Sequence, residues 1–185
     1  ENGLVTGVKA GTTTIRVASV ANPDVNSEFT IGVIGNRIIS NDLDVKHSDT
    51  DNVEESYVIG SEPAIELEDY LALFVNEPEY LHVYSSEDNG GVEIEDGVIV
   101  GSFMEIALII NNHEYDRVTI LIRGDLDGDG YVSSADVSVA EEVIGGKKAE
   151  TVFLNLITDV DYDTYISSAD NSIVNEFIGG KINTL

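Results

Sequence analysis

The sequence predicts a multidomain protein in which an all-β part is followed by an all-α part built from paired loop–helix repeats. Residues 1–34 and 35–123 contain short, alternating apolar runs rich in β-branched residues, with turn signals between them, and such runs are typical of strands. From Gly124 the chain instead alternates loops dense in aspartate and glycine with segments of helical periodicity. Two of these loops are near copies that begin at Asp125 and Asp159.

Composition limits the partners of the chain. Its 185 residues are 42% hydrophobic, and its formal net charge is −26. This charge repels nucleic acid and anionic membranes and favours cations or a basic partner. There is no cysteine, so no disulfide framework exists, and no apolar run approaches the length of a membrane span. The chain starts at Glu1 without a signal peptide, and we expect it to be a piece of a longer protein.

In the β part, strands are expected at 12–20, 80–84, 92–100, 106–110 and 116–123, with a hairpin loop at the "NNHE" run from Asn111. The run "ENGLVTG" at 1–7 matches "EDGVIVG" at 95–101. The longer run "NGLVTGVKAGTTTI" resembles the bacterial immunoglobulin-like family, group 2. This resemblance implies antiparallel β-sandwiches that serve as spacers or adhesion modules. Residues 1–34 would be the C-terminal part of one immunoglobulin-like module, and residues 35–123 a complete sandwich.

The dodecamers "DLDGDGYVSSAD" and "DVDYDTYISSAD" have the spacing of the EF-hand calcium loop. Positions 1, 3, 5 and 12 supply carboxylates, position 7 a backbone carbonyl, and position 9 a hydroxyl that can hold a water. Four carboxylates this close would repel one another strongly without a cation. The sequence therefore predicts two Ca²⁺ ions, with the ligands Asp125, Asp127, Asp129, Tyr131, Ser133 and Asp136 in the first loop and Asp159, Asp161, Asp163, Tyr165, Ser167 and Asp170 in the second.

The two loops differ at position 6, where the first has Gly130 and the second has Thr164. Glycine suits a sharp turn that needs a positive φ. A β-branched residue at such a φ costs on the order of 1–3 kcal/mol. We therefore expect the first loop to bind calcium more tightly than the second.

Each loop leads into a predicted helix that begins near Ser133 or Ser167, where Ser-x-x-Asp gives the N-cap pattern. Both helices are expected to end at a Gly-Gly pair, at 145–146 and 179–180. A short connecting helix is expected in "ETVFLNLI" from Glu150. The apolar stripes predict the inward-facing residues Val139, Ala140, Val143, Ile144, Ile173, Val174, Phe177 and Ile178.

Residues 124–185 resemble the dockerin family from end to end, through two loop–helix repeats of this length, a linking helix, and a strand rather than a helix before Asp125. The resemblance implies an all-α calcium-binding fold. Dockerins bind cohesin modules on scaffold proteins and so assemble polysaccharide-degrading enzymes into secreted, cellulosome-like complexes at the bacterial surface. A β-sandwich directly upstream is similar to the X-module that accompanies some dockerins.

Calcium does not explain all of the repetition, since 14 of 23 aligned positions are identical between 125–147 and 159–181. In dockerins, positions 10, 11 and 18 of each repeat contact the cohesin. Glutamate stands at position 18 here, where many dockerins have lysine or arginine, and this indicates a cohesin with a basic patch. The alternative explanation for the shared residues is a recent duplication after which the two repeats have not yet diverged in sequence. The predicted partner contacts are Ser134, Ala135, Ser138, Glu142, Ser168, Ala169, Ser172 and Glu176.

Other chemistry is weakly represented. The histidines His47, His82 and His113 are scattered, and the pair Glu66 and Glu68 is typical of a solvated strand face. The tyrosines between 57 and 84 favour core packing over a sugar-stacking platform. We therefore expect a non-catalytic segment, although a parent protein extending upstream could be an enzyme. The alternative hypothesis is an adhesion or carbohydrate-binding protein whose calcium domain is purely structural.

Overall fold

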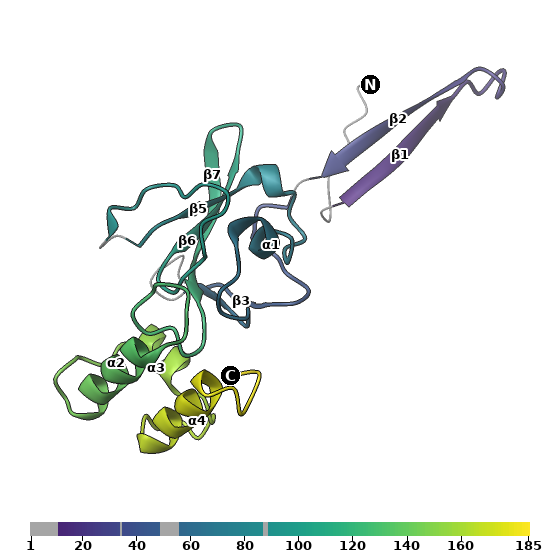
Figure 1. The fold of residues 1–185 in the computed structure, drawn as a ribbon. Coiled ribbons are helices and arrows are strands. Elements are labelled where there is room, and N and C mark those ends of the chain that lie inside the picture. The colour runs from purple at the N-terminus through teal and green to yellow at the C-terminus, as the bar shows by residue number, and fades with distance from the viewer. Residues whose placement is uncertain (1–10, 34, 49–55, 87–88) are drawn as a thin grey trace. The chain divides into compact units, whose positions relative to one another are not determined.

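The computed structural model describes residues 11–33, 35–48, 56–86 and 89–185, and the chain divides into two compact units, Glu1–Arg37 and Ile38–Leu185. The described part of the first unit is a hairpin of β1 (Gly11–Ala18) and β2 (Asn26–Val33), paired antiparallel along their whole length (Figure 1). The expected strand at 12–20 is thus confirmed over most of its length. The run at 1–7 lies outside the described residues.

The second unit contains a five-stranded sheet with the strand order β3-β4-β7-β6-β5. The β6–β7 hairpin is the predicted one, and its two turn residues, Asn111 and Asn112, have φ values of 53° and 61°. Such left-handed turns match the twist of the flanking strands, and asparagine tolerates them. The expected strand at 92–100 does not form, because Glu93 and Ile99 make only isolated bridges. The strands are β3 (Asp44–Lys46), β4 (Tyr57–Ile59), β5 (Leu81–Tyr84), β6 (Glu105–Ile110) and β7 (His113–Leu121).

The helices of the second unit are α1 (Leu67–Leu71), the 3₁₀ turn η2 (Pro78–Tyr80), α2 (Ser134–Ile144), α3 (Val152–Thr158) and α4 (Ser168–Ile178). The predicted N-caps are confirmed: Ser133 and Ser167 each cap a helix in a capping box. The Gly-Gly ends and the connecting helix are confirmed as well. Gly146 and Gly180 have φ values of 66° and 67°, the left-handed conformation in which helices commonly end.

Two apolar cores lie against the sheet, because successive residues of a strand point to opposite faces. Val58 and Ile120 belong to the larger core, together with Tyr70 of α1. Their neighbours Ile59 and Leu121 point the other way. They join a second core that the sheet shares with α2, α3 and the first dodecamer, made of Ile59, Leu121, Leu126, Ala140, Val143, Leu154 and Ile157.

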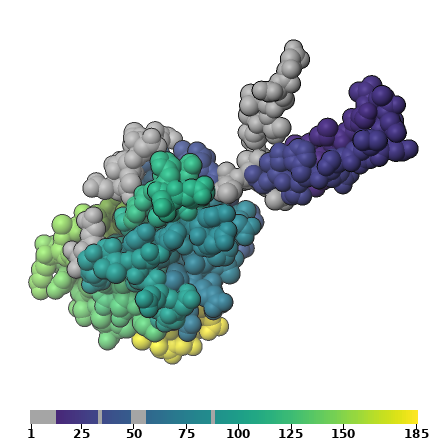
Figure 2. All heavy atoms as spheres, turned by 90° about the horizontal axis from the view of Figure 1, so that it is seen from above, coloured from purple at the N-terminus to yellow at the C-terminus, as the bar shows by residue number. Residues whose placement is uncertain are grey.

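The predicted fold class, an immunoglobulin-like sandwich followed by an all-α domain, is wrong. In its described residues the second unit is a mixed α/β fold with one sheet, in which β4 and β7 run parallel. The segment 124–185 does not form an all-α domain, because its helices complete their core with strand residues of the same unit. In Figure 2 the teal spheres of the sheet region and the green spheres of the segment that follows it lie directly against one another. Two residues predicted to face inward, Ile144 and Ile178, are 43% and 41% exposed.

Candidate metal centre

The first dodecamer brings three carboxylates together. Ligand atoms of Asp125, Asp127 and Asp136 all lie within 4.8 Å of one another. Asp125 and Asp136 are fully buried, whereas Asp127 is exposed. Backbone N–H groups fix both buried carboxylates: Gly128 and Gly130 donate to Asp125 at 3.0 and 3.2 Å. The carboxylates therefore converge before any ion is considered.

Asp136 closes the first loop from the first turn of α2. Its Oδ1 accepts from the N–H groups of Leu126 and Asp127 at 2.7 and 3.1 Å, and its Oδ2 accepts from the N–H of Ser133 at 2.7 Å. One carboxylate thus ties the start of the loop to the N-cap of the helix. This is why an aspartate at position 12 suffices to complete the turn.

The second dodecamer repeats this network. Ligand atoms of Asp159, Asp161 and Asp170 lie within 4.8 Å of one another, and Asp170 is fully buried. Asp170 accepts from the N–H groups of Val160 and Ser167 at 3.0 and 2.8 Å. The Oδ1 atom of Asp159 is buried without a hydrogen-bond partner, which is unusual for a carboxylate oxygen.

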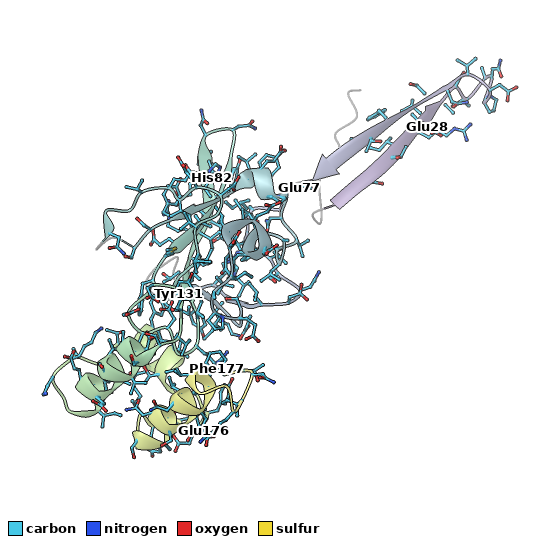
Figure 3. All side chains as sticks on the ribbon, viewed as in Figure 1. Glu28, Glu77, His82, Tyr131, Glu176 and Phe177 are labelled. Atoms are coloured by element: carbon cyan, nitrogen blue, oxygen red, sulfur yellow. The ribbon has the colours of Figure 1, made fainter. Side chains whose placement is uncertain are left out.

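The other predicted ligands lie outside these two groups of three. Asp129 and Asp163 stay in their loops, where each accepts a hydrogen bond from the backbone two residues on, at 2.8 Å in both cases. The hydroxyls of Ser133 and Ser167 accept from the N–H groups at 135 and 169 as helix N-caps. The side chains of Tyr131 and Tyr165 are exposed. Tyr131 is labelled in Figure 3 above the helices.

The electrostatics of both groups disfavour an ion-free carboxylate cluster. Burial raises the pKa of Asp125 to about 6, although hydrogen bonds from Ser102 oppose this. Burial and the charge of Asp136 raise the pKa of Asp127. At Asp161 the N–H of Asp163 lowers the pKa, but desolvation and the surrounding carboxylates outweigh it. Within the described part of the chain, no ion pair joins these carboxylates to Lys, Arg or His.

The oxygen-only donor set, the buried negative charge and the unpartnered oxygen of Asp159 fit a hard divalent cation such as Ca²⁺. The two groups of three acidic residues could each hold a metal ion. The same φ pattern recurs in both loops at positions 4 and 6. Gly128 and Gly130 have φ values of 81° and 84°, and Tyr162 and Thr164 have φ values of 62° and 74°. The strain expected at Thr164 is present, and Tyr162 adds a second strained position that the sequence did not indicate.

The predicted partner-binding residues all lie on the exposed surfaces of two helices that contact each other, α2 and α4. Ser138 and Ser172 donate their hydroxyls to the carbonyls one turn back at 3.1 and 2.9 Å, and Glu176 forms a 3.8 Å ion pair with Lys181. Glu176 lies on α4, as Figure 3 shows. The exposed set is Ser134, Ala135, Ser138, Glu142, Ser168, Ala169, Ser172 and Glu176.

The histidines do not gather into a metal site in the described residues. His47 pairs with Asp116 at 2.7 Å, His82 with Glu93 at 2.6 Å, and His113 stacks edge-on against a tyrosine. Glu66 and Glu68 lie at the start of α1 and not on a strand. The large aromatic residues of this region include core residues: Tyr70 is 1% exposed and packs edge-on against Phe74.

One contact of the site was missed by sequence reasoning. The N–H of Ser102 donates to Oδ2 of Asp125 at 2.6 Å, and Ser102 is fully buried. Ser102 precedes Asp125 by 23 residues and belongs to no recognisable motif, so no sequence signal marks it.

No protein family, curated protein or solved structure matches this chain. Within the described part of the chain, no helix is long and apolar enough to cross a membrane.

Proposed function

We propose that residues 124–185 bind two Ca²⁺ ions and, held in shape by them, dock onto a cohesin module of a scaffold protein. The protein is then a non-catalytic docking segment of a secreted, polysaccharide-degrading complex at the bacterial surface. The observation that carries the proposal is the twofold recurrence of one carboxylate network, with a buried closing aspartate, Asp136 or Asp170, at the start of each of two contacting helices.

Calcium is favoured over other cations by the ligand chemistry. Both groups consist of carboxylates alone in the described residues, with no histidine or cysteine among them, and hard oxygen ligands select Ca²⁺ or Mg²⁺ over zinc and copper. A loop that offers ligands from several sequence positions suits the larger and more flexible coordination sphere of Ca²⁺. Mg²⁺ requires near-octahedral geometry and keeps several waters.

Docking is favoured by the repeated exposed face. The identical residues Ser134, Ala135 and Glu142 on α2 and Ser168, Ala169 and Glu176 on α4 serve neither the metal groups nor the apolar cores. Identity of exposed side chains that neither bind the metal nor fill a core is what a binding surface used by both helices would require. The glutamates give this face a negative charge, so the complementary cohesin surface is basic.

The experiment is capture of the 185-residue chain by a panel of immobilised cohesin modules, in calcium and in excess chelator. Capture by at least one cohesin in calcium, but not in excess chelator, supports the proposal. The double variant Ala135→Arg with Ala169→Arg should abolish capture, because it places a long charged side chain on both copies of the face. Ala149→Arg alters an exposed alanine outside α2 and α4 and serves as the matched control, with capture unchanged.

Failure of every cohesin, or equal capture in chelator, would contradict the docking function. In that case polysaccharide pull-down with the same chain tests the alternative, an adhesion or carbohydrate-binding protein with a structural calcium site. Calcium binding itself is measured separately, so the two parts of the proposal can fail independently.

A further inference from the structure

We propose that the segment 99–103 of the sheet region is part of the first metal site, and that it holds Asp125 in binding geometry before the metal arrives. In the described residues, no hydrogen bond from the sheet region reaches a carboxylate of the second site. This inference rests on the proposed binding of calcium. It adds a positioning residue, Ser102, and a difference in calcium affinity between two sites of nearly identical sequence.

Ser102 is fixed from two sides. Its N–H donates to Oδ2 of Asp125 at 2.6 Å. Its hydroxyl accepts from the N–H of Ile122 at 3.0 Å and donates to the carbonyl of Ile122 at 3.2 Å. Ile122 directly follows β7 and precedes Asp125 by three residues. Ser102 therefore links the end of the central strand to the first metal-binding carboxylate, as outer-shell groups do in metalloproteins.

The first loop and this segment are in backbone contact. A Cβ atom on Gly101 would lie 2.3 Å from the carbonyl oxygen of Gly128, and one on Gly130 would lie 2.6 Å from the carbonyl oxygen of Val100. The carbonyl of Gly130 also accepts from the N–H of Ala64 at 2.7 Å. These distances leave no room for side chains, so the glycines permit the loop to dock on the sheet region.

The second loop shows that the turn itself does not require glycine. Tyr162 and Thr164 adopt the same left-handed conformation at the corresponding positions, and both are exposed. Its first carboxylate, Asp159, accepts from the N–H of Thr164 at 3.1 Å within its own loop, and its Oδ1 is buried without a partner. The first site is thus preorganised from outside the loop at its first carboxylate. The carboxylates of the second site accept hydrogen bonds from their own loop. Arg123 contacts that loop through the ring of Tyr162, at 4.9 Å, and not through a carboxylate.

Two consequences follow. A preorganised site loses less conformational freedom on binding, so the first site binds Ca²⁺ more tightly than loop sequence alone predicts. Because coupling between two equilibria is reciprocal, calcium in the first site stabilises the contact between the first loop and segment 99–103. Calcium in the second site does not.

The test uses Gly101→Ala, whose added methyl group should separate segment 99–103 from the first loop. The φ of Gly101 lies outside the left-handed region, so alanine is tolerated by its own backbone. The three atoms nearest to its Cβ all belong to the first loop, and alanine conflicts with that loop. Calcium affinity of the first site is measured by calorimetry in an Asp161→Ala background, and that of the second site in an Asp127→Ala background. Loss of an outer-shell partner typically lowers metal affinity by about 10- to 100-fold. We expect that loss at the first site and no change at the second.

Gly179→Ala, at the C-cap of α4 with a φ of −76°, is the matched glycine control and should change neither affinity. If Gly101→Ala does not fold, Ser102→Ala replaces it. Ser102→Ala removes both hydroxyl bonds to Ile122 while keeping the N–H, and we expect a smaller loss confined to the first site. Hydrogen exchange of the Ser102 amide gives an independent readout, and calcium should slow it in the Asp161→Ala background and not in the Asp127→Ala background.

Equal losses at both sites, or an unchanged first site, would overturn the inference while leaving two-site calcium binding intact. An unaltered chain that binds no calcium would instead overturn the proposed function, and the inference with it.

Discussion

Relief of backbone strain in the second loop should strengthen its affinity for calcium. Thr164 has a φ of +74° and an exposed side chain. Its N–H bond to Asp159, at 3.1 Å, is kept by any non-proline residue. Removing the strain of a β-branched residue in the left-handed region returns on the order of 1–3 kcal/mol. Glycine offsets roughly 0.5–1 kcal/mol of this through its greater freedom in the unconstrained loop.

The net gain for Thr164→Gly is about 1 kcal/mol, or about fivefold in affinity. Calorimetric titration in the Asp127→Ala background isolates the second site. Thr164→Ala is the matched control: it removes the hydroxyl and the β-branch but keeps a Cβ at positive φ, so it recovers only part of the gain. An affinity for Thr164→Gly equal to or below that of the parent would show that strain at this position does not limit binding.

Three further predictions concern stability and calcium binding. Leu126→Ala removes a side chain that is 2% exposed from the core shared by sheet and helices, which lowers the free energy of unfolding by on the order of 2–5 kcal/mol. In denaturant titrations the spectroscopic signals of strands and helices should be lost in one transition, at a lower denaturant concentration than in the parent. Separate transitions would contradict the shared core. Asp136→Ala leaves three N–H groups without their acceptor. Each of them that stays buried lowers the free energy of unfolding by about 1–3 kcal/mol. Calorimetric titration with calcium should show the loss of the first site and the retention of the second. The pKa of Asp125, raised by burial to about 6, contributes stability that is full below its ordinary pKa and is lost as pH rises through about 6. The melting temperature in chelator should therefore rise when pH falls from 7 to 5, and a fall would show that burial of Asp125 does not set the trend.

The local structure of the C-terminal part could be predicted from sequence because its signals are short-range. The N-caps Ser133 and Ser167, the Gly-Gly ends and the asparagine turn at 111–112 each depend on residues within one turn of the chain. The convergence of the carboxylates at positions 1, 3 and 12 of each loop follows from the same local spacing.

The arrangement of the sheet could not be predicted in this way, because it depends on contacts between distant segments. Alternation in β7 identifies a strand but does not distinguish a sandwich from a mixed sheet with a parallel neighbour. The pairing of Tyr57 with Thr119 decides between them, and it joins residues 62 positions apart in the sequence. The prediction of a separate all-α domain was wrong for the same reason, since the strand residues Ile59 and Leu121 complete the core of the helices.

The exposed residues Ile144 and Ile178 show the limit of helical periodicity. Both fall on the apolar stripe of their helices, but each is the last helical residue. A stripe predicts which side of a helix is buried and not how far the neighbouring element extends along it. Ser102 was missed because its contribution to the site is chiefly a backbone N–H, which every residue except proline carries.

The central claim is that each dodecamer binds one Ca²⁺ ion, and calorimetric titration of the chelator-stripped 185-residue chain with calcium tests it most directly. We expect two calcium ions per chain with unequal affinities, one ion each for the Asp127→Ala and Asp161→Ala variants, and none for the double variant. Absence of binding at millimolar calcium, or two ions bound by the double variant, would contradict the account.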